Sequence, residues 1–354
     1  MLLAAFVAAA VPCSAQDASA LARAGTAAIE AGRFADALSA FTTAAAMRPR
    51  DASLCFGAGV AAFMLGQDGV AQTRFECALA LNPNLLAAAK WLADLHYRVG
   101  RLSDAIAVYE TASQHAPLPG ELEQQLDAWR KQRDLQSRFH ELHTDHFTVL
   151  VEMAADEGRA RTIVERLEMA YSRIGRTLGV YPSRRVTVVL YTRERFDDIT
   201  KLADWSVAAY DGCIRVPLGG ALEQSDELDR VLSHEFVHAL VATLGGRTVP
   251  AWLNEGLATV LEPAGPADAE AVLARSGARL ARSTLQAGFV SLSRRDAEIA
   301  YASAARAVRR LVERRGMPAL IALLEDLARG VPFDRAFRNR MAMRYDDFAA
   351  LLAP

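Results

Sequence analysis

The stretch VLSHEFVHALVATLGGRTVPAWLNEGLATV, residues 231–260, holds two histidines four positions apart with a glutamate directly after the first. Residues four apart on a helix project from the same face, so His234 and His238 could share one metal ion. Glu235 is turned about 100° further round the helix, where a base could take a proton from water without itself being a ligand. The spacing therefore predicts a metal site on one helix.

The residues around the two histidines predict how this helix begins, ends and packs. Ser225 or Asp226 could cap its start, and Gly245 with Gly246 predicts its end. A core helix whose histidines are satisfied by hydrogen bonds is the alternative to a metal site. The flanking apolar residues expected to be buried are Val231, Leu232, Phe236, Val237, Leu240 and Val241.

A third ligand has to come from outside this helix, because a catalytic zinc usually takes three protein ligands and leaves a fourth position to water. The chain has Leu244 where the longer H-E-x-x-H-x-x-G-x-x-H pattern needs a histidine, so that arrangement is excluded. Glu255 is the remaining candidate. Pro250 predicts the start of a second helix, and the glutamate follows one turn later. Gly256 is expected to let this helix pack closely against the first.

A period of 34 residues runs through the first third of the chain. The glycine of each unit predicts a turn between two antiparallel helices, small alanines and an aromatic residue fill the space between them, and a proline ends the second helix. The units resemble tetratricopeptide repeats, and three copies cover residues 16–119. The resemblance implies a right-handed solenoid whose concave face binds a protein partner, although a purely intramolecular clamp is equally open. The repeating positions are Gly32, Gly66 and Gly100; Ala37, Ala71 and Ala105; Phe41, Phe75 and Tyr109; Ala44, Ala78 and Ala112; and Pro49, Pro83 and Pro117.

Between the repeats and the two histidines, the pattern changes from helical to mixed. Residues 120–142 keep a helical spacing and predict a capping helix that links the two parts of the chain. Residues 146–153 and 186–193 alternate and are rich in β-branched side chains, which predicts strands, with a helix over 160–179 between them. A third strand is expected over 208–219, directly before the histidine-bearing helix.

The two motif helices resemble those of the gluzincin, or peptidase MA-like, zinc metallopeptidases. In that group, H-E-x-x-H is followed by a glutamate in a W-x-x-E-G-x-A setting, which Trp252, Glu255, Gly256 and Ala258 fill here. The resemblance runs from the strands that begin at residue 146 to the C-terminal helical segment. It departs at Thr259, where thermolysin-like members carry an aspartate that supports the first histidine, so the residue with that role is unidentified.

The resemblance implies hydrolysis of peptide bonds by a zinc-activated water. His234, His238 and Glu255 would hold the zinc, and Glu235 would be the general base and later the proton donor to the leaving amine. Two other carboxylates could replace the third ligand: Glu227 and Glu262.

Two further parts of the site follow from the same resemblance. Tyr301, on a downstream helix, is a candidate hydrogen-bond donor to the developing oxyanion, and Tyr210 competes for that role. Packing of Tyr301 against Trp252 or Leu253 is the alternative interpretation. The strand around 209–218 would be an edge strand, to which an extended peptide substrate adds by backbone hydrogen bonds.

The predicted fold is multidomain: an all-α tetratricopeptide solenoid, followed by an α+β zincin-like metallopeptidase domain with a helical C-terminal part. The predicted boundaries are 1–15 for a signal peptide, 16–119 for the repeats, 120–142 for the linker helix and 143–354 for the peptidase domain. The competing function is a catalytically weak metal-binding scaffold whose repeats recruit envelope proteins. The intact Glu235 favours the enzyme, because a decayed enzyme would be expected to lose its base.

The composition indicates a compartment and argues against some partners. The 354 residues carry 40 Lys+Arg against 42 Asp+Glu, with no block of like charges, which argues against a nucleic-acid binder. An apolar run that ends in Cys13-Ser14-Ala15 predicts a signal peptide cleaved after Ala15, although no basic residue precedes the run. No later run is long enough to span a bilayer. The mature protein is therefore expected to be periplasmic or secreted.

Three cysteines would remain after cleavage: Cys55, Cys77 and Cys213. This odd and sparse set cannot form a disulfide framework. All three are expected to be plain core residues, with a Cys55–Cys77 bridge as the alternative.

Overall fold

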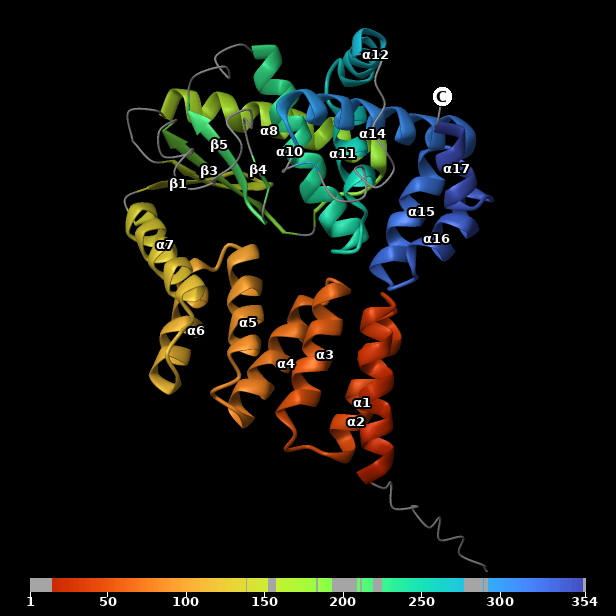
Figure 1. The fold of residues 1–354 in the computed structure, drawn as a ribbon. Helices are drawn as coiled ribbons and strands as arrows, with labels where there is room; N and C mark the ends of the chain where they lie inside the picture. Colours follow the sequence, from red (N-terminus) through yellow and green to blue (C-terminus); the bar gives the residue numbers. More distant parts are fainter. Residues whose placement is uncertain are drawn as a thin grey trace, which may run out of the picture.

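The computed structural model has a repeat part, residues 15–137, and an α/β part, residues 139–352 (Figure 1). It describes residues 15–137, 139–151, 157–182, 184–192, 209–210, 212–218, 225–276, 289 and 292–352. Helices alone form the repeat part, and a small mixed sheet with helices forms the other, so the predicted fold class is confirmed. Residues 1–14 of the predicted signal peptide lie outside the described residues. Among the described helices, none has the length and apolar character needed to cross a membrane.

The three repeats are helical hairpins whose turns contain glycine. The backbone angle φ is +68° at Gly32, +71° at Gly66 and +77° at Gly100, in the left-handed region that favours glycine. Because the three glycines share one period, their turns lie at the same edge of the array (Figure 1). The helices are α1 (Ala15–Glu30), α2 (Phe34–Met47), α3 (Ala52–Met64), α4 (Asp68–Leu81), α5 (Leu86–Arg98) and α6 (Leu102–His115).

The aromatic residue of each repeat is buried between helices, as its period predicts. Phe41, Phe75 and Tyr109 are all at most 5% exposed. Glycines make room for two of these rings: a Cβ on Gly57 would lie 2.6 Å from the Phe41 ring, and one on Gly59 would lie 2.6 Å from the Phe75 ring. The repeat part is therefore held together by large rings packed against helix backbone.

A disulfide joins the two helices of the second repeat. Cys55 of α3 and Cys77 of α4 are bonded, with their Cα atoms 6.0 Å apart. The expectation of plain core thiols is therefore wrong for these two residues, whereas Cys213 is buried as predicted. Helical spacing places both cysteines in one hairpin, but which helix faces meet depends on how the hairpin packs.

The segment after the repeats is a helix followed by a strand. α7 (Gly120–Gln136) caps the repeats, because Trp129 stacks on both Tyr97 and Tyr109 at centroid distances of 5.1 and 5.2 Å. β1 (His140–His143) then pairs antiparallel with β2 (Phe147–Val151). The predicted helix over 120–142 is therefore too long, because strand pairing overrides local helical spacing at its end.

The sheet has the strand order β1-β2-β3-β5-β4. β2, β3 (Val186–Thr192) and β5 (Ile214–Leu218) are parallel, whereas β1 and β4 (Ala209–Tyr210) are antiparallel to their neighbours. α8 (Glu157–Leu178) connects β2 to β3 and shares a hydrophobic core with both strands. The predicted strands and the helix between them are present, with ends that differ by a few residues.

The predicted third strand is two strands joined by a turn. Gly212, with φ of +111°, lies in this turn, and Tyr210 of β4 pairs with Ile214 of β5. β5 therefore lies between β3 and β4, and the side chains of Ile214 and Val216 are fully buried. The expectation that 209–218 forms one edge strand is wrong, because β4 already pairs with the outer side of β5 at Ile214.

The first motif helix begins and ends where predicted, and the second begins at Pro250 as predicted. α10 (Ser225–Gly245) packs its apolar face into the core that it shares with α8 and the sheet. α11 (Ala251–Leu261) follows with Pro250 at its N-cap, and its Trp252 is 2% exposed. The remaining helices are α12 (Gly265–Ser276), α14 (Arg294–Arg315), α15 (Met317–Ala328), α16 (Phe333–Met341) and α17 (Tyr345–Leu352).

The disulfide predicts a measurable stabilisation of the repeats. The two cysteines are 22 residues apart, and cross-linking a loop of this length stabilises a fold by about 3 kcal/mol in the chain-entropy model. We expect the double variant C55S/C77S to unfold at a lower denaturant concentration than the wild type. Mass spectrometry after alkylation without reductant checks the bond itself. Alkylation of both cysteines in the folded, unreduced protein would contradict the disulfide.

Candidate metal centre

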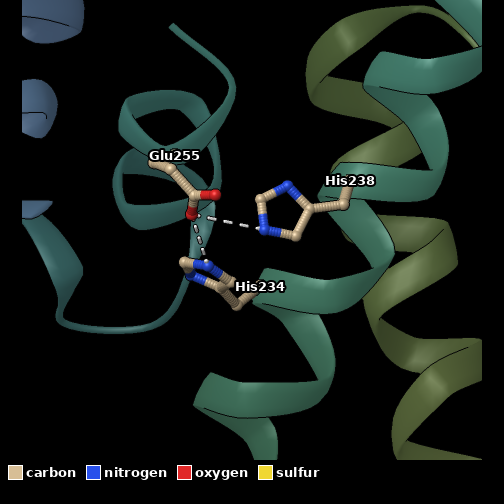
Figure 2. A group of neighbouring side chains, drawn as sticks. All are labelled: His234, His238 and Glu255. Carbon is tan, nitrogen blue, oxygen red and sulfur yellow. Dashed lines mark hydrogen bonds and ion pairs between the residues drawn. The ribbon is translucent and has the colours of Figure 1, made fainter. Parts of the chain in front are cut away.

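Three side chains from two helices converge between α10 and α11 (Figure 2). His234 and His238 project from one face of α10, and Glu255 approaches them from α11. The Oε2 atom of Glu255 lies 3.3 Å from Nε2 of His234 and 3.4 Å from Nε2 of His238. The possible ligand atoms all lie within 4.8 Å of one another, and no other such group occurs in the described part of the chain. These three predicted residues are therefore brought together and could hold a metal ion.

The second ring nitrogen of each histidine also has a partner. Nδ1 of His234 lies 3.5 Å from the carboxylate of Glu262, and Nδ1 of His238 lies 3.0 Å from Oδ1 of Asn254. Both partner oxygens are hydrogen-bond acceptors, which favours the tautomer with the proton on Nδ1. In this tautomer Nε2, the atom nearest Glu255, is the atom of each ring that could bind a metal ion.

Glu262 is the partner of the first histidine that the sequence left unidentified. It is seven residues after Glu255, which puts the two carboxylates on the same side of the helix two turns apart; this spacing could have revealed it. Its side chain is 5% exposed and lies 3.3 Å from Arg230, which also pairs with Glu227 at 2.6 Å. Thr259, at the position where thermolysin-like members carry an aspartate, donates to the Glu255 carbonyl.

Glu235 and Tyr301 line the same cavity as His234, with a volume of about 400 Å³. Glu235 is 7% exposed. The Tyr301 ring lies 5.9 Å from the His234 ring and 5.1 Å from that of Phe289, measured between centroids. Burial, and then the nearby carboxylates, raise the pKa of Tyr301 above its ordinary value. Its hydroxyl therefore stays protonated at neutral pH and can donate a hydrogen bond.

Gly256 lets α14 approach the site. A Cβ on Gly256 would lie 2.5 Å from the Ala304 carbonyl oxygen, so this glycine packs against α14 and not, as predicted, against α10. The close approach brings Tyr301, about two turns into α14, next to His234. Trp252, against which Tyr301 was alternatively expected to pack, packs against rings of α16 and α17. Tyr210, the competing donor, lies on β4.

The site stabilises positive charge beside Glu255. Burial lowers the pKa of His234, but the carboxylates of Glu255 and Glu262 outweigh this effect and raise it to about 10. Burial likewise raises the pKa of Glu255, yet the two histidines outweigh it and hold this pKa well below its usual range. A cation, either a proton on an imidazole or a metal ion, is therefore favoured next to an ionised Glu255 at neutral pH.

Comparison with known families agrees with this geometry. The family model described as Peptidase MA superfamily matches residues 169–348, about half of the chain, and the chain belongs to this superfamily. The model described as Tetratricopeptide repeat matches residues 22–69 and 69–118. The resemblance to a peptidase MA-like protein with N-terminal repeats is therefore confirmed.

Solved structures and curated proteins add little to the family assignment. A solved structure described as "First TPR of Spaghetti (RPAP3) bound to HSP90 peptide SRMEEVD" is similar at 21% sequence identity, covering 34% of this chain and 98% of that chain, with a TM-score of 0.32. No curated protein matches the chain.

The contact between Glu262 and His234 can be tested by mutation. Replacing Glu262 with Ala removes the carboxylate that orients the ring, and the loss of such a partner weakens metal affinity by roughly 10–100-fold. Competition with a chromogenic chelator measures this affinity. Replacing Glu227 with Ala is the matched control: it removes the other carboxylate that pairs with Arg230, leaves the one beside His234 in place, and should have a smaller effect. Equal affinities in both variants and the wild type would show that Glu262 does not orient His234.

Proposed function

We propose that this chain is a zinc-dependent peptidase that hydrolyses peptide bonds. The observation that carries the proposal is the approach of one Glu255 oxygen to the Nε2 atoms of both histidines, at 3.3 and 3.4 Å. Membership of the Peptidase MA superfamily suggests a metallopeptidase and supports the same conclusion.

The donor set and its spacing suit zinc. Zinc binds imidazole nitrogen and carboxylate oxygen at about 2.0–2.2 Å, so two such ligands at a tetrahedral angle lie about 3.3 Å apart. The Nε2–Oε2 distances of 3.3 and 3.4 Å match this separation. Three protein ligands leave a fourth position open, which is typical of catalytic zinc and not of structural zinc.

The side chains around the ligands have separate roles in the proposed reaction. Zinc, when bound, supplies Lewis acidity, which polarises the scissile carbonyl and lowers the pKa of water. Glu235 accepts the proton of the attacking water and passes it to the amine nitrogen as the C–N bond breaks. Tyr301 donates a hydrogen bond to the carbonyl oxygen as negative charge develops on it. Glu262 and Asn254 keep the two imidazoles in the orientation in which Nε2 faces Glu255.

We also propose that the enzyme works in the periplasm or outside the cell. The apolar run before Ala15 is typical of an export signal, and the Cys55–Cys77 disulfide is of a kind that persists in oxidising compartments. Tetratricopeptide repeats typically mediate protein interactions, so the concave face is the proposed surface for a protein partner.

The role of Glu235 gives the most direct test of catalysis. Replacing Glu235 with Gln removes the base but no ligand, so we expect one equivalent of bound zinc and no hydrolysis of casein or of a peptide library. Replacing Glu255 with Ala is the matched variant and should lose zinc, because one of three protein ligands disappears. Zinc content and turnover are measured on both. Wild-type protein that binds one zinc yet cleaves no peptide would instead favour a metal-binding scaffold.

The role of Tyr301 gives a separate test of oxyanion stabilisation. Replacing Tyr301 with Phe keeps the ring packed against Phe289 and removes only the hydroxyl. We expect kcat to fall by roughly 10–1000-fold with KM and zinc content nearly unchanged, because the lost hydrogen bond forms in the transition state. Replacing Tyr171 of α8 with Phe is the matched control. A kcat near that of the wild type would make Tyr301 a packing residue.

A further inference from the structure

The edge of the repeat array that carries the glycine turns lies against the α/β part (Figure 1). Two of the contacts leave no room for a side chain at the glycine, and the third is an ordinary van der Waals contact. A Cβ on Gly212 would lie 1.7 Å from the Arg98 carbonyl oxygen, and one on Gly330 would lie 2.5 Å from the Leu65 side chain. The turn at Gly212 therefore meets backbone at the end of α5, whereas Gly330 packs against a side chain next to the turn of the second repeat. The contacting pairs are Gly330 with Leu65, Gly246 with Gly66, and Gly212 with Arg98.

Arg247 crosses this boundary from the turn between the two ligand helices. Its Nη1 atom donates hydrogen bonds to the Phe63 carbonyl oxygen and to Oδ1 of Asp68, both at 2.7 Å. Its guanidinium carbon lies 3.9 Å from the centre of the Phe63 ring. The Arg247 side chain is 20% exposed, so most of it is enclosed by the turn of the second repeat. Arg247 therefore ties the α10–α11 turn to that repeat through its side chain, beside the backbone contact of Gly246 with Gly66.

The turn that carries Arg247 determines where Glu255 lies. Residues 246–250 link α10, which holds both histidines, to α11, which holds the carboxylate. On one side of the turn, a Cβ on Gly245 would lie 2.3 Å from Val249 and 3.3 Å from Leu324 of α15. Arg247 holds the other side. Because α11 is a rigid rod, a shift of the turn carries Glu255 with it, and such sites tolerate a misplacement of only about 0.5 Å.

We propose that the second repeat is part of the metal centre: Phe63 and Asp68 hold Arg247, and Arg247 positions the α10–α11 turn so that Glu255 meets His234 and His238. Arg247 is a positioning residue, because it is not among the residues that line the cavity and acts through the turn. The inference rests on the proposed function only in taking these three residues to bind a metal. It gives the repeats a role inside the chain, in addition to any partner on their concave face.

The test measures metal affinity of the full chain, and not only activity. We expect the variant R247A to bind zinc roughly 10-fold more weakly than the wild type, and the absorption spectrum of its cobalt form to change, because the third ligand is less well placed. Replacing Arg247 with Lys keeps the charge beside Asp68 and should restore most of the affinity. Should R247A fail to fold, the variant D68A removes the same contact from the side of the repeat and should also weaken zinc binding.

The controls remove comparable charged contacts that lie wholly within the repeat part. Arg130 pairs with Glu110 at 2.9 Å, and Asp36 pairs with Arg33 at 3.1 Å. We expect R130A and D36A to keep wild-type zinc affinity and cobalt spectra, whatever they do to the melting temperature. Equal affinities in R247A, D68A and these controls would overturn the proposal. A wild type that binds zinc but cleaves no peptide would overturn the proposed function alone, because the affinity comparison stands without hydrolysis.

Discussion

The burial of a carboxylate between two imidazoles is the constraint on which the rest of the structure depends. Glu255, His234 and His238 have side chains that are only 20, 15 and 10% exposed. A buried carboxylate costs several kcal/mol unless a positive charge accompanies it. The surroundings raise the pKa of His234 and lower that of Glu255, so the charged forms of both groups are favoured. A metal ion satisfies the same requirement, and its binding would release the proton.

Several helices hold these three side chains together by fixing the positions of α10 and α11. α10 is fixed by its apolar face, which packs into the core of α8 and the sheet. α11 is fixed by Trp252 at its start and by Gly256 in its middle, where the backbone of α14 comes close. Glu262 and Asn254 then contact the Nδ1 atoms of His234 and His238, the ring nitrogens that do not face Glu255. On this basis, the C-terminal helices serve the site by positioning α11, although none of them supplies a ligand.

Features encoded in a few neighbouring residues could be predicted from the sequence. The 34-residue period fixes the helical hairpins because each turn needs a left-handed glycine, and H-E-x-x-H fixes the histidine face because helix geometry is regular. Glu255 could be identified as the candidate third ligand by elimination, because Leu244 rules out a third histidine on the first helix. The partner of His234 was missed, although the seven-residue step from Glu255 to Glu262 is a local signal.

Features that depend on which elements pack against each other could not be predicted in the same way. β1 forms because β2 lies beside it, and β4 folds back on β5 at Gly212. The sequence identifies Gly256 as a close-packing position but does not say that α14 is its neighbour. The Cys55–Cys77 bond and the contacts of Arg247 likewise depend on which surfaces meet after the helices have formed. These last two pairings join residues 22 and 179 positions apart, and no local pattern records them.

The central claim is that His234, His238 and Glu255 together hold one zinc ion. An anomalous difference map at the zinc edge, from crystals of the zinc-loaded protein, tests it most directly. We predict a single strong peak between α10 and α11, about 2.0–2.2 Å from Nε2 of each histidine and from the Glu255 carboxylate. A peak bound by Glu262 in place of Glu255 would contradict the claim. So would a peak elsewhere, with none between His234, His238 and Glu255.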